Sequence, residues 1–200
     1  MGRKSKAKVR KQEILSHFYE VIIDEGFENA SIAKIAKRMD VNPSLLIHYF
    51  KNKDAMVLGL IDYIINTYSV HILPDFSGTE DAQERWEDVL DVVSRIQWDR
   101  IMNNAVFYSC YTLTFGNEEI KRRFQGLYKG LINTISYEIE HASKAGIIHV
   151  KDAKAAAELI ISMVEGTNYY QHVSPEKVEA EERASRTKQI LSAMLSSGDV

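Results

Sequence analysis

The 200-residue chain has little of what secreted, membrane-spanning or irregular proteins need. It contains one cysteine, Cys110, so it cannot form an internal disulfide, and we expect a reducing compartment. No apolar run approaches the roughly 18 to 20 residues that a membrane-spanning helix requires. The first residues, Met-Gly-Arg-Lys, lack the apolar stretch of a signal peptide. Only three prolines interrupt the chain, which leaves room for long helices. These absences predict a soluble cytoplasmic protein with no membrane span.

The charge of the chain is unevenly distributed. Residues 1–53 carry eleven Lys and Arg against six Asp and Glu, a net charge of +5. Residues 54–200 carry fourteen against twenty-two, a net charge of −8. A basic N-terminal quarter on an acidic remainder is typical of a protein that meets a polyanion with one end only. A merely solvated basic segment is the alternative.

Apolar residues recur at helical spacing along most of the chain, and no useful strand alternation is present. The spacing predicts an all-α fold of about nine helices, near residues 9–25, 31–39, 43–50, 53–72, 80–97, 99–114, 118–144, 153–172 and 175–196. Residues 1–8 are expected to form a flexible basic arm that could reach a minor groove. Glycines and polar caps give the helix ends: Gly26, Gly146, Ser31, Asn42, Asn52 and Asp152.

The second and third of these helices are short and closely connected, as in a helix-turn-helix. Asp40-Val41-Asn42 forms the connection, and Pro43 occupies the first position of the following helix, where its missing N–H does no harm. Because a helix of two turns is marginal alone, its neighbours must hold it. Its outer face is then free to enter a DNA major groove.

The segment Ser31 to Met56, SIAKIAKRMDVNPSLLIHYFKNKDAM, resembles the tetracycline-repressor-like (TetR) family of transcriptional regulators. The resemblance in residues covers about Ile14 to Leu60 and rests on length and helix count beyond that point. It implies a DNA-binding domain at residues 1–53 and an effector-binding and dimerisation domain at residues 54–200. The implied function is a ligand-responsive homodimeric repressor that binds a palindromic operator.

The resemblance also implies which residues contact DNA. Ser31 matches a phosphate contact at the start of the second helix. Base contacts fall at the start of the third helix, and further phosphate contacts lie at its end and at the start of the fourth; these positions are Asn42, Pro43, Ser44, Leu45, His48, Tyr49 and Lys53. The family often has Lys-Gly-Thr at positions 43–45 and an aromatic residue at 47, so the operator sequence stays open. Leu45 fits either a thymine methyl group or wedge packing.

Two further surfaces are predicted in residues 54–200. One is a dimer interface on the last two helices, formed by Leu159, Met163, Tyr170, Ile190, Leu191 and Met194. The other, which the family resemblance implies, is a pocket for a small apolar or amphipathic effector, with the candidate wall residues Trp98, Asn103, Phe107, Tyr111 and Tyr128. Both stripes could instead be ordinary core.

Motifs for catalysis, cofactors and metals are lacking. There is no glycine-rich phosphate loop, nucleophile elbow or zinc spacing, so we expect no enzyme, no cofactor and no metal site. Glu138 and His141 form a lone carboxylate–histidine pair that we expect at the surface. There are two alternatives to the ligand-responsive repressor. One is an effector-independent architectural or cell-division DNA binder of the same fold, and the other is a helical enzyme or binding protein with a vestigial DNA-binding domain.

Overall fold

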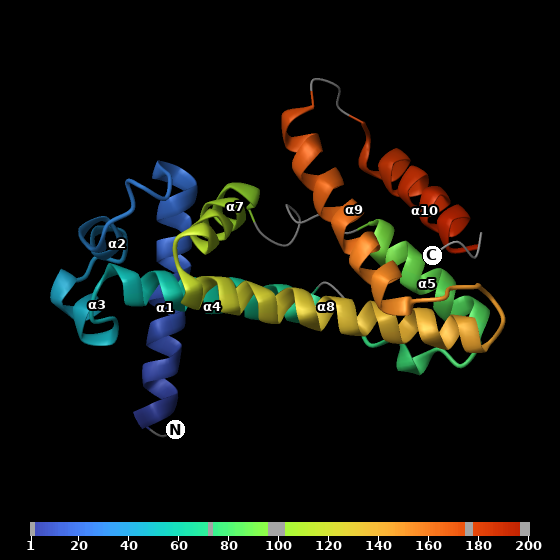
Figure 1. Ribbon diagram of the computed structural model, residues 1–200. Helices are drawn as coiled ribbons and strands as arrows, with labels where there is room; N and C mark the ends of the chain where they lie inside the picture. Colours follow the sequence, from blue (N-terminus) through green and yellow to red (C-terminus); the bar gives the residue numbers. More distant parts are fainter. Residues whose placement is uncertain (1–2, 72–73, 96–102, 175–177, 197–200) are drawn as a thin grey trace. The chain divides into compact units, whose positions relative to one another are not determined.

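The structure is a computed structural model that describes residues 3–71, 74–95, 103–174 and 178–196. Within these ranges the chain forms nine α-helices and two short 3-10 helices, with no strand (Figure 1). The all-α prediction is therefore confirmed. The chain packs as two compact units, Met1–Tyr68 with Asp99–Gln125, and Ser69–Trp98 with Gly126–Val200. This division by packing differs from the functional division at residue 53, which stays a prediction.

The first unit contains the helix-turn-helix. Its elements are α1 (Arg3–Glu25), α2 (Ile32–Arg38), α3 (Pro43–Tyr49), most of α4 (Lys53–His71), α7 (Asn104–Thr112), the 3-10 helix η2 (Leu113–Phe115) and the start of α8 (Glu118–Lys144). Figure 1 shows α2 and α3 as two short helices beside α1, and both pack against it.

The expectation of a flexible arm at residues 1–8 is wrong for the described part of that segment. Helix α1 begins at Arg3 rather than near Val9. From Arg3 to Lys11 the sequence has no glycine or proline, and most of its residues are Lys, Arg or Ala, which favour helix. The basic side chains from Lys6 onward are therefore carried on a helix.

The caps predicted from sequence are present. Gly26 and Gly146 have positive φ, at 82° and 75°, and stand just after the ends of α1 and α8. The side chains of Asn52 and Asp152 accept hydrogen bonds from backbone N–H groups in the first turns of α4 and α9 (Ala153–Val173). Local signals of this kind therefore predicted these four helix ends.

A continuous apolar core holds the first unit together. Its members are almost fully buried and come from every α-helix of the unit: Ile14, Phe18, Ile35, Leu46, Met56, Leu60, Ile61, Ile64, Val106, Phe107, Cys110, Ile120 and Phe124. In addition, the Tyr19 hydroxyl accepts a hydrogen bond from the Asn103 N–H at 2.6 Å. This bond joins α1 to the N-terminus of α7.

The second unit is built on α5 (Ala82–Ser94), α9, α10 (Ala180–Ser196) and the rest of α8, with a 3-10 helix η1 (Phe76–Gly78). Helix α10 packs on α5 (Figure 1), and Lys188 of α10 forms ion pairs with Glu87 and Asp91 of α5, both at 2.8 Å. Helix α5 begins after its cap Asp81, and α10 begins at Ala180 rather than near Pro175. Residues 175–177 lie outside the described residues.

One side chain in the second unit is placed differently from the prediction. Glu138 was expected at the surface beside His141, but it is 5% exposed and pairs with Arg85 of α5. No helix in the described part of the chain combines the length and apolarity needed to cross a bilayer.

Candidate nucleic-acid interface

The helix-turn-helix is shaped by its turn and its caps. The Ser31 hydroxyl accepts the Lys34 N–H at 3.3 Å, and the Asn42 side chain accepts the Ser44 N–H at 2.9 Å. Between them, Asp40 adopts a left-handed conformation with φ 52°, which a short polar side chain tolerates. The Val41 N–H then donates to the Ala36 carbonyl at 3.0 Å. These bonds join α2 to α3 in a tight connection.

Helix α3 is held from its inner side and exposed on its outer side. Leu46 is fully buried, and Phe50, just after the helix, is 5% exposed. The exposed side chains lie three and four residues apart and therefore share one face; they are Pro43, Ser44, Ile47 and His48. A seven-residue helix with an anchored inner face and a free outer face can enter a groove.

The remaining candidate residues lie around this face. Asn42 is exposed, whereas Ser31, Leu45, Tyr49 and Lys53 are half-buried. The rings of His48 and Tyr49 meet edge to face, with 5.1 Å between their centroids. Half-burial of Leu45 favours its packing role over a base contact. Ile47, which is 52% exposed, is the apolar side chain that is better placed to contact a base.

Lys53 is the first residue of α4. Its ammonium lies 5.6 Å from the centroid of the Phe27 ring. Among the residues that the structure describes, Lys53 has no ion pair with a carboxylate. A cation at a helix N-terminus opposes the helix dipole, so a nearby anion would stabilise it.

Sequence reasoning missed that ion pairs within the helix-turn-helix unit already neutralise some of its basic residues. Lys34 pairs with Glu25, and Arg38 pairs with Asp24 and Glu20, so two cations of α2 are bound to acids of α1. The net charge of +5 therefore says little about where the free cations lie. The spacing of these acids on α1 was visible in the sequence, but their partners depend on how α2 packs.

The predicted effector residues are divided between the two units. Asn103 caps α7 by accepting the Ala105 N–H at 2.9 Å, and Phe107 and Tyr111 of α7 stack on one another with 6.4 Å between ring centroids. Phe107 is 1% exposed and forms part of the core. Tyr128 belongs to the second unit, where its hydroxyl donates to Glu165 at 3.0 Å, and Trp98 lies outside the described residues.

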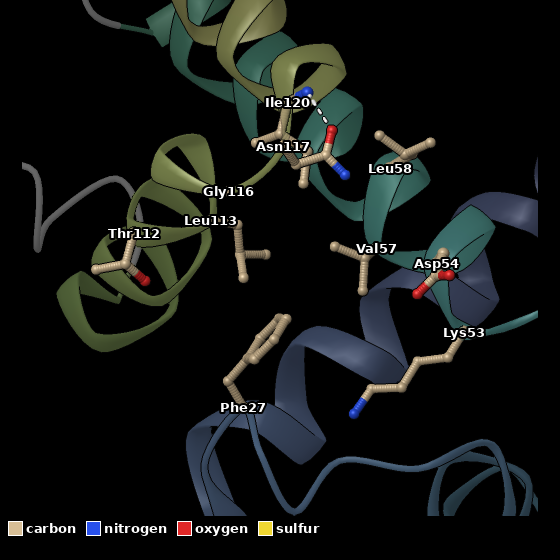
Figure 2. Close-up of a pocket in the computed structure, with 10 residues that line it drawn as sticks. All are labelled: Phe27, Lys53, Asp54, Val57, Leu58, Thr112, Leu113, Gly116, Asn117 and Ile120. Carbon is tan, nitrogen blue, oxygen red and sulfur yellow. Dashed lines mark hydrogen bonds between the residues drawn. The ribbon is translucent and has the colours of Figure 1, made fainter.

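A cavity of about 510 Å³ lies elsewhere in the first unit, between the start of α4 and the segment from α7 to α8 (Figure 2). Its walls are mainly apolar, with a few polar groups: Phe27, Lys53, Asp54, Val57, Leu58, Thr112, Leu113, Gly116, Asn117 and Ile120. Neither sequence spacing nor composition indicated it, because its walls come from three separate segments.

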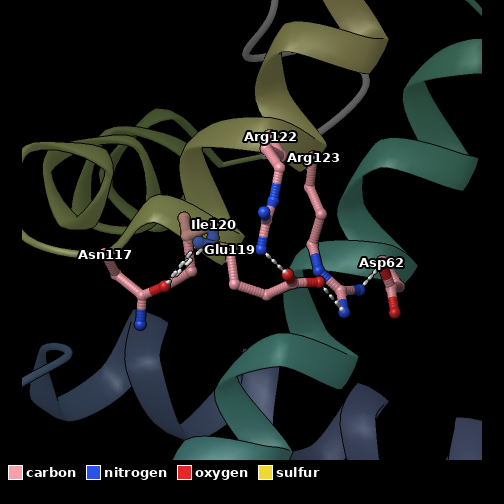
Figure 3. Close-up of polar contacts among 6 residues, drawn as sticks. All are labelled: Asp62, Asn117, Glu119, Ile120, Arg122 and Arg123. Atoms are coloured by element: carbon pink, nitrogen blue, oxygen red, sulfur yellow. Dashed lines mark hydrogen bonds and ion pairs between the residues drawn. The ribbon is translucent and has the colours of Figure 1, made fainter.

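Polar contacts fasten one wall of this cavity to α4 (Figure 3). Arg123 of α8 pairs with Asp62 of α4 and, at 3.1 Å, with Glu119. Arg122, hydrogen-bonded to Glu119 at 2.6 Å, and then Arg123 lower the pKa of the Glu119 carboxyl. Asn117 caps α8 by accepting the N–H groups of Glu119 and Ile120. The start of α8 is thereby held against α4.

The predicted dimer residues lie on α9 and α10 of the second unit. Leu159 is 42% exposed, Tyr170 64% and Ile190 55%, while Met163 and Met194 are half-buried. Leu191 is fully buried inside the single chain, so it supports the helix rather than a surface. Sequence reasoning missed two neighbours on α9, Tyr169 and Val173, which are more than 60% exposed.

Comparison with protein families decides the class of protein. Residues 14–60 match the family described as bacterial regulatory proteins, tetR family. Residues 82–197, more than half of the chain, match the tetracyclin repressor-like C-terminal domain. The chain belongs to the TetR family. As such it is a DNA-binding transcriptional regulator.

Individual relatives of this TetR-family protein have differing roles. It is 22% identical over 157 residues to the fatty acid metabolism regulator protein of Bacillus subtilis, covering 78% of this chain and 79% of that protein. It is 25% identical over 160 residues to the nucleoid occlusion factor SlmA of Vibrio cholerae, covering 79% and 81%. A transcriptional regulator from Saccharomonospora viridis in complex with choline shares its fold, with a TM-score of 0.79 at 16% identity over 92% of this chain and 96% of that one.

Proposed function

We propose that this protein is a homodimeric, ligand-responsive repressor that reads a palindromic operator with α3. The observation that carries the proposal is the exposed face of α3, formed by Pro43, Ser44, Ile47 and His48, on a helix anchored by Leu46. Such a face supplies base contacts, while Ser31, Tyr49 and Lys53 at its edges supply contacts to phosphates.

Each phosphate contact has a chemical basis in this proposal. Ser31 uses its hydroxyl oxygen to cap α2, which leaves the hydroxyl hydrogen to donate to a phosphate oxygen. Tyr49 donates its phenolic hydrogen. Lys53 contributes a full positive charge. Because Asn42 caps α3 through its side-chain oxygen, its amide nitrogen is left to donate to DNA.

The dimer is proposed from the exposed apolar side chains of α9 and α10. Leu159, Tyr170 and Ile190 are large apolar groups in contact with water in the single chain. Exposed apolar side chains that gather on one surface mark protein–protein interfaces. Two-fold symmetry then places two copies of α3 about 34–36 Å apart, or a multiple of that distance, which explains why a palindromic site is expected.

An effector is supported by the relatives rather than by the predicted wall residues. The fatty acid metabolism regulator is named for a metabolic role, and the solved regulator was crystallised with choline. A second candidate function is an effector-independent DNA binder with an architectural or cell-division role. The similarity to the nucleoid occlusion factor favours it, at an identity slightly above that of the metabolic regulator.

The test is titration of the purified protein with duplex DNA at several salt concentrations. We expect log K to fall linearly with log salt, and Lys53→Met to weaken binding to all sequences and reduce the slope by about 1. Lys129→Met, an exposed lysine on α8 in the second unit, is the matched control and should change neither quantity. Absence of binding at low salt would contradict the proposal.

Selection of bound fragments from genomic DNA separates the two candidates. A repressor should select a few palindromic sites beside promoters. An architectural protein should select many sites spread over the chromosome.

A further inference from the structure

The cavity at the start of α4 has the size and character of a small-molecule site. Its volume of about 510 Å³ falls within the roughly 300–1,000 Å³ typical of ligand pockets. Phe27, Val57, Leu113 and Ile120 give it apolar walls. It is distinct from the predicted effector residues Trp98, Asn103, Phe107, Tyr111 and Tyr128, because none of them lines it.

Lys53 is the polar group that decides what the cavity would bind. Figure 2 shows its side chain extending below Val57 toward Phe27. It is half-buried and, in the described part of the chain, has no ion pair with a carboxylate. Its ammonium lies 5.6 Å from the centroid of the Phe27 ring, a contact that does not neutralise its charge. An anion beside Lys53 would supply the missing partner.

The other charged wall residue does not play the same role. Asp54 is exposed and stands in the first turn of α4, where the helix dipole stabilises its charge. Its short side chain keeps the carboxylate close to the backbone of α4 (Figure 2). Asn117 uses its side-chain oxygen as a cap, so it faces a ligand only as an amide donor. The Asn117 amide and the Lys53 ammonium therefore both favour a ligand group that accepts hydrogen bonds over one that donates them.

We propose that this cavity binds an amphipathic organic anion, with its acidic group on Lys53 and its apolar body between Phe27, Val57, Leu113 and Ile120. The charge-assisted hydrogen bond to Lys53 gives selectivity for the anion, and burial of the apolar body gives affinity. The cavity is thus an anion-selective effector site beside the helix-turn-helix.

Binding at this site has a consequence for DNA, and that consequence rests on the proposed role of Lys53 as a phosphate contact. The same ammonium serves either the ligand or the DNA backbone. A bound anion also places a negative charge next to the phosphate position. Ligand and DNA must therefore weaken each other by the same factor. A ligand that fills the apolar walls without an acidic group leaves Lys53 available.

The first experiment measures ligand binding without DNA, so its result does not depend on the proposed function. Decanoate and 1-decanol have the same apolar chain, and their affinities are measured by calorimetry on the full-length protein. Lys53→Met should weaken decanoate binding about tenfold and leave decanol binding unchanged. Leu113→Trp, which fills the cavity, should weaken both. Lys51→Met, at an exposed neighbour that does not line the cavity, is the control for charge and should affect neither.

Thr112→Trp is a second cavity-filling variant, to be used if Leu113→Trp fails to fold. Thr112 is exposed at the rim of the cavity, so its substitution should disturb the fold less. Decanoate binding that survives the folded cavity-filling variant, or that is as strong in Lys53→Met as in the wild type, overturns the proposal. So does failure of the wild type to bind decanoate at millimolar concentration.

The second experiment adds duplex DNA at low salt. Saturating decanoate should weaken DNA binding by about tenfold or more, whereas decanol and an equal concentration of acetate should not. If DNA binds in the absence of ligand but decanoate and decanol weaken it equally, the competition for Lys53 is wrong while the proposed function stands. If DNA does not bind at all, the proposed function fails, and the calorimetric result still decides the cavity.

Discussion

Arg85 and Glu138 form a bidentate ion pair inside the second unit, 53 positions apart in sequence. The Arg85 Nε and Nη2 atoms donate to the two Glu138 carboxylate oxygens, each at 2.7 Å. The side chains are 9% and 6% exposed, and the guanidinium lies 5.9 Å from the centroid of the Tyr137 ring. The pair joins α5 to α8 through two hydrogen bonds of fixed geometry.

Removing one partner of this pair should destabilise the protein strongly. Glu138→Gln leaves the buried Arg85 charge without a counterion, at an expected cost of about 3–5 kcal/mol in the free energy of unfolding. The double variant Arg85→Met with Glu138→Leu should recover much of that loss, because neither charge remains buried. Urea denaturation followed by circular dichroism measures both. Glu140→Gln, in an exposed pair with Lys144, is the control and should cost less than about 1 kcal/mol.

The burial of Glu138 shows what sequence reasoning could and could not reach. Caps such as Asn42 and stops such as Gly26 act within a few residues, so the helix order followed from local chemistry. The position of Glu138 depends on which face of α8 meets α5, and no local signal reports that. The exposed face of α3 was predicted, whereas Leu45 was left open between a thymine contact and wedge packing, because its half-burial depends on how α3 packs. The cavity, and the ion pairs that Lys34 and Arg38 form with acids of α1, were missed for the same reason.

Gly59 of α4 should resist substitution by alanine. An added Cβ would lie 2.9 Å from Cε1 of Phe50 and 3.3 Å from Cδ2 of Leu15, so the Phe50 ring must move. The helix gains about 1 kcal/mol from replacing glycine, but crowding of the core costs about 1–3 kcal/mol. We expect a lower melting temperature and weaker DNA binding, because Phe50 anchors the end of α3. Gly130→Ala on α8, where an added Cβ meets nothing within 4 Å, should stabilise the protein instead. Equal stabilisation by both substitutions would show that α4 does not need this close approach.

Ile47 should contribute to recognition of DNA sequence without contributing to stability. Its side chain is 52% exposed, so Ile47→Ala removes little buried surface in the free protein. If Ile47 contacts a thymine methyl group, the variant should lose about 1–2 kcal/mol in binding to the selected operator and little on random duplex. The salt dependence should stay the same because no charge is removed. Leu45→Ala is the comparison: its half-buried side chain predicts a loss of stability first. An equal loss of affinity on operator and random duplex would remove Ile47 from the base contacts.

Tyr170 should be needed for the proposed dimer. Tyr170→Asp places a charge among the exposed apolar side chains of α9 and should shift the protein from dimer to monomer at micromolar concentration. Sedimentation velocity measures the change. Phe115→Asp is the matched control, since Phe115 is 85% exposed but belongs to the first unit. Dissociation by Phe115→Asp, with Tyr170→Asp still dimeric, would place the interface elsewhere.

Cys110 should make the protein lose stability at alkaline pH. The thiol is fully buried in α7, and burial raises its pKa to about 12 from an ordinary value of 9.0. Below pH 9 the thiol keeps its proton in both the folded and the unfolded chain. The stability that depends on the protonated Cys110 thiol is therefore fully present there. Between pH 9 and 12 the unfolded chain releases that proton and the folded chain retains it, so the free energy of unfolding falls as pH rises. The loss should reach about 1 kcal/mol near pH 10.

Cys110→Ala isolates this contribution, because it removes the thiol and leaves the other titrating groups in place. The variant should be less stable than the wild type at pH 7, owing to the small cavity it creates, and the difference should shrink toward pH 10. Burial also raises the pKa of Tyr19, so Tyr19→Phe is measured in parallel to separate the two groups. The folded wild type should react slowly with a thiol reagent at pH 8, since the reactive form is the thiolate. A difference between wild type and Cys110→Ala that stays constant from pH 7 to 10 would mean that the thiol titrates equally in both states.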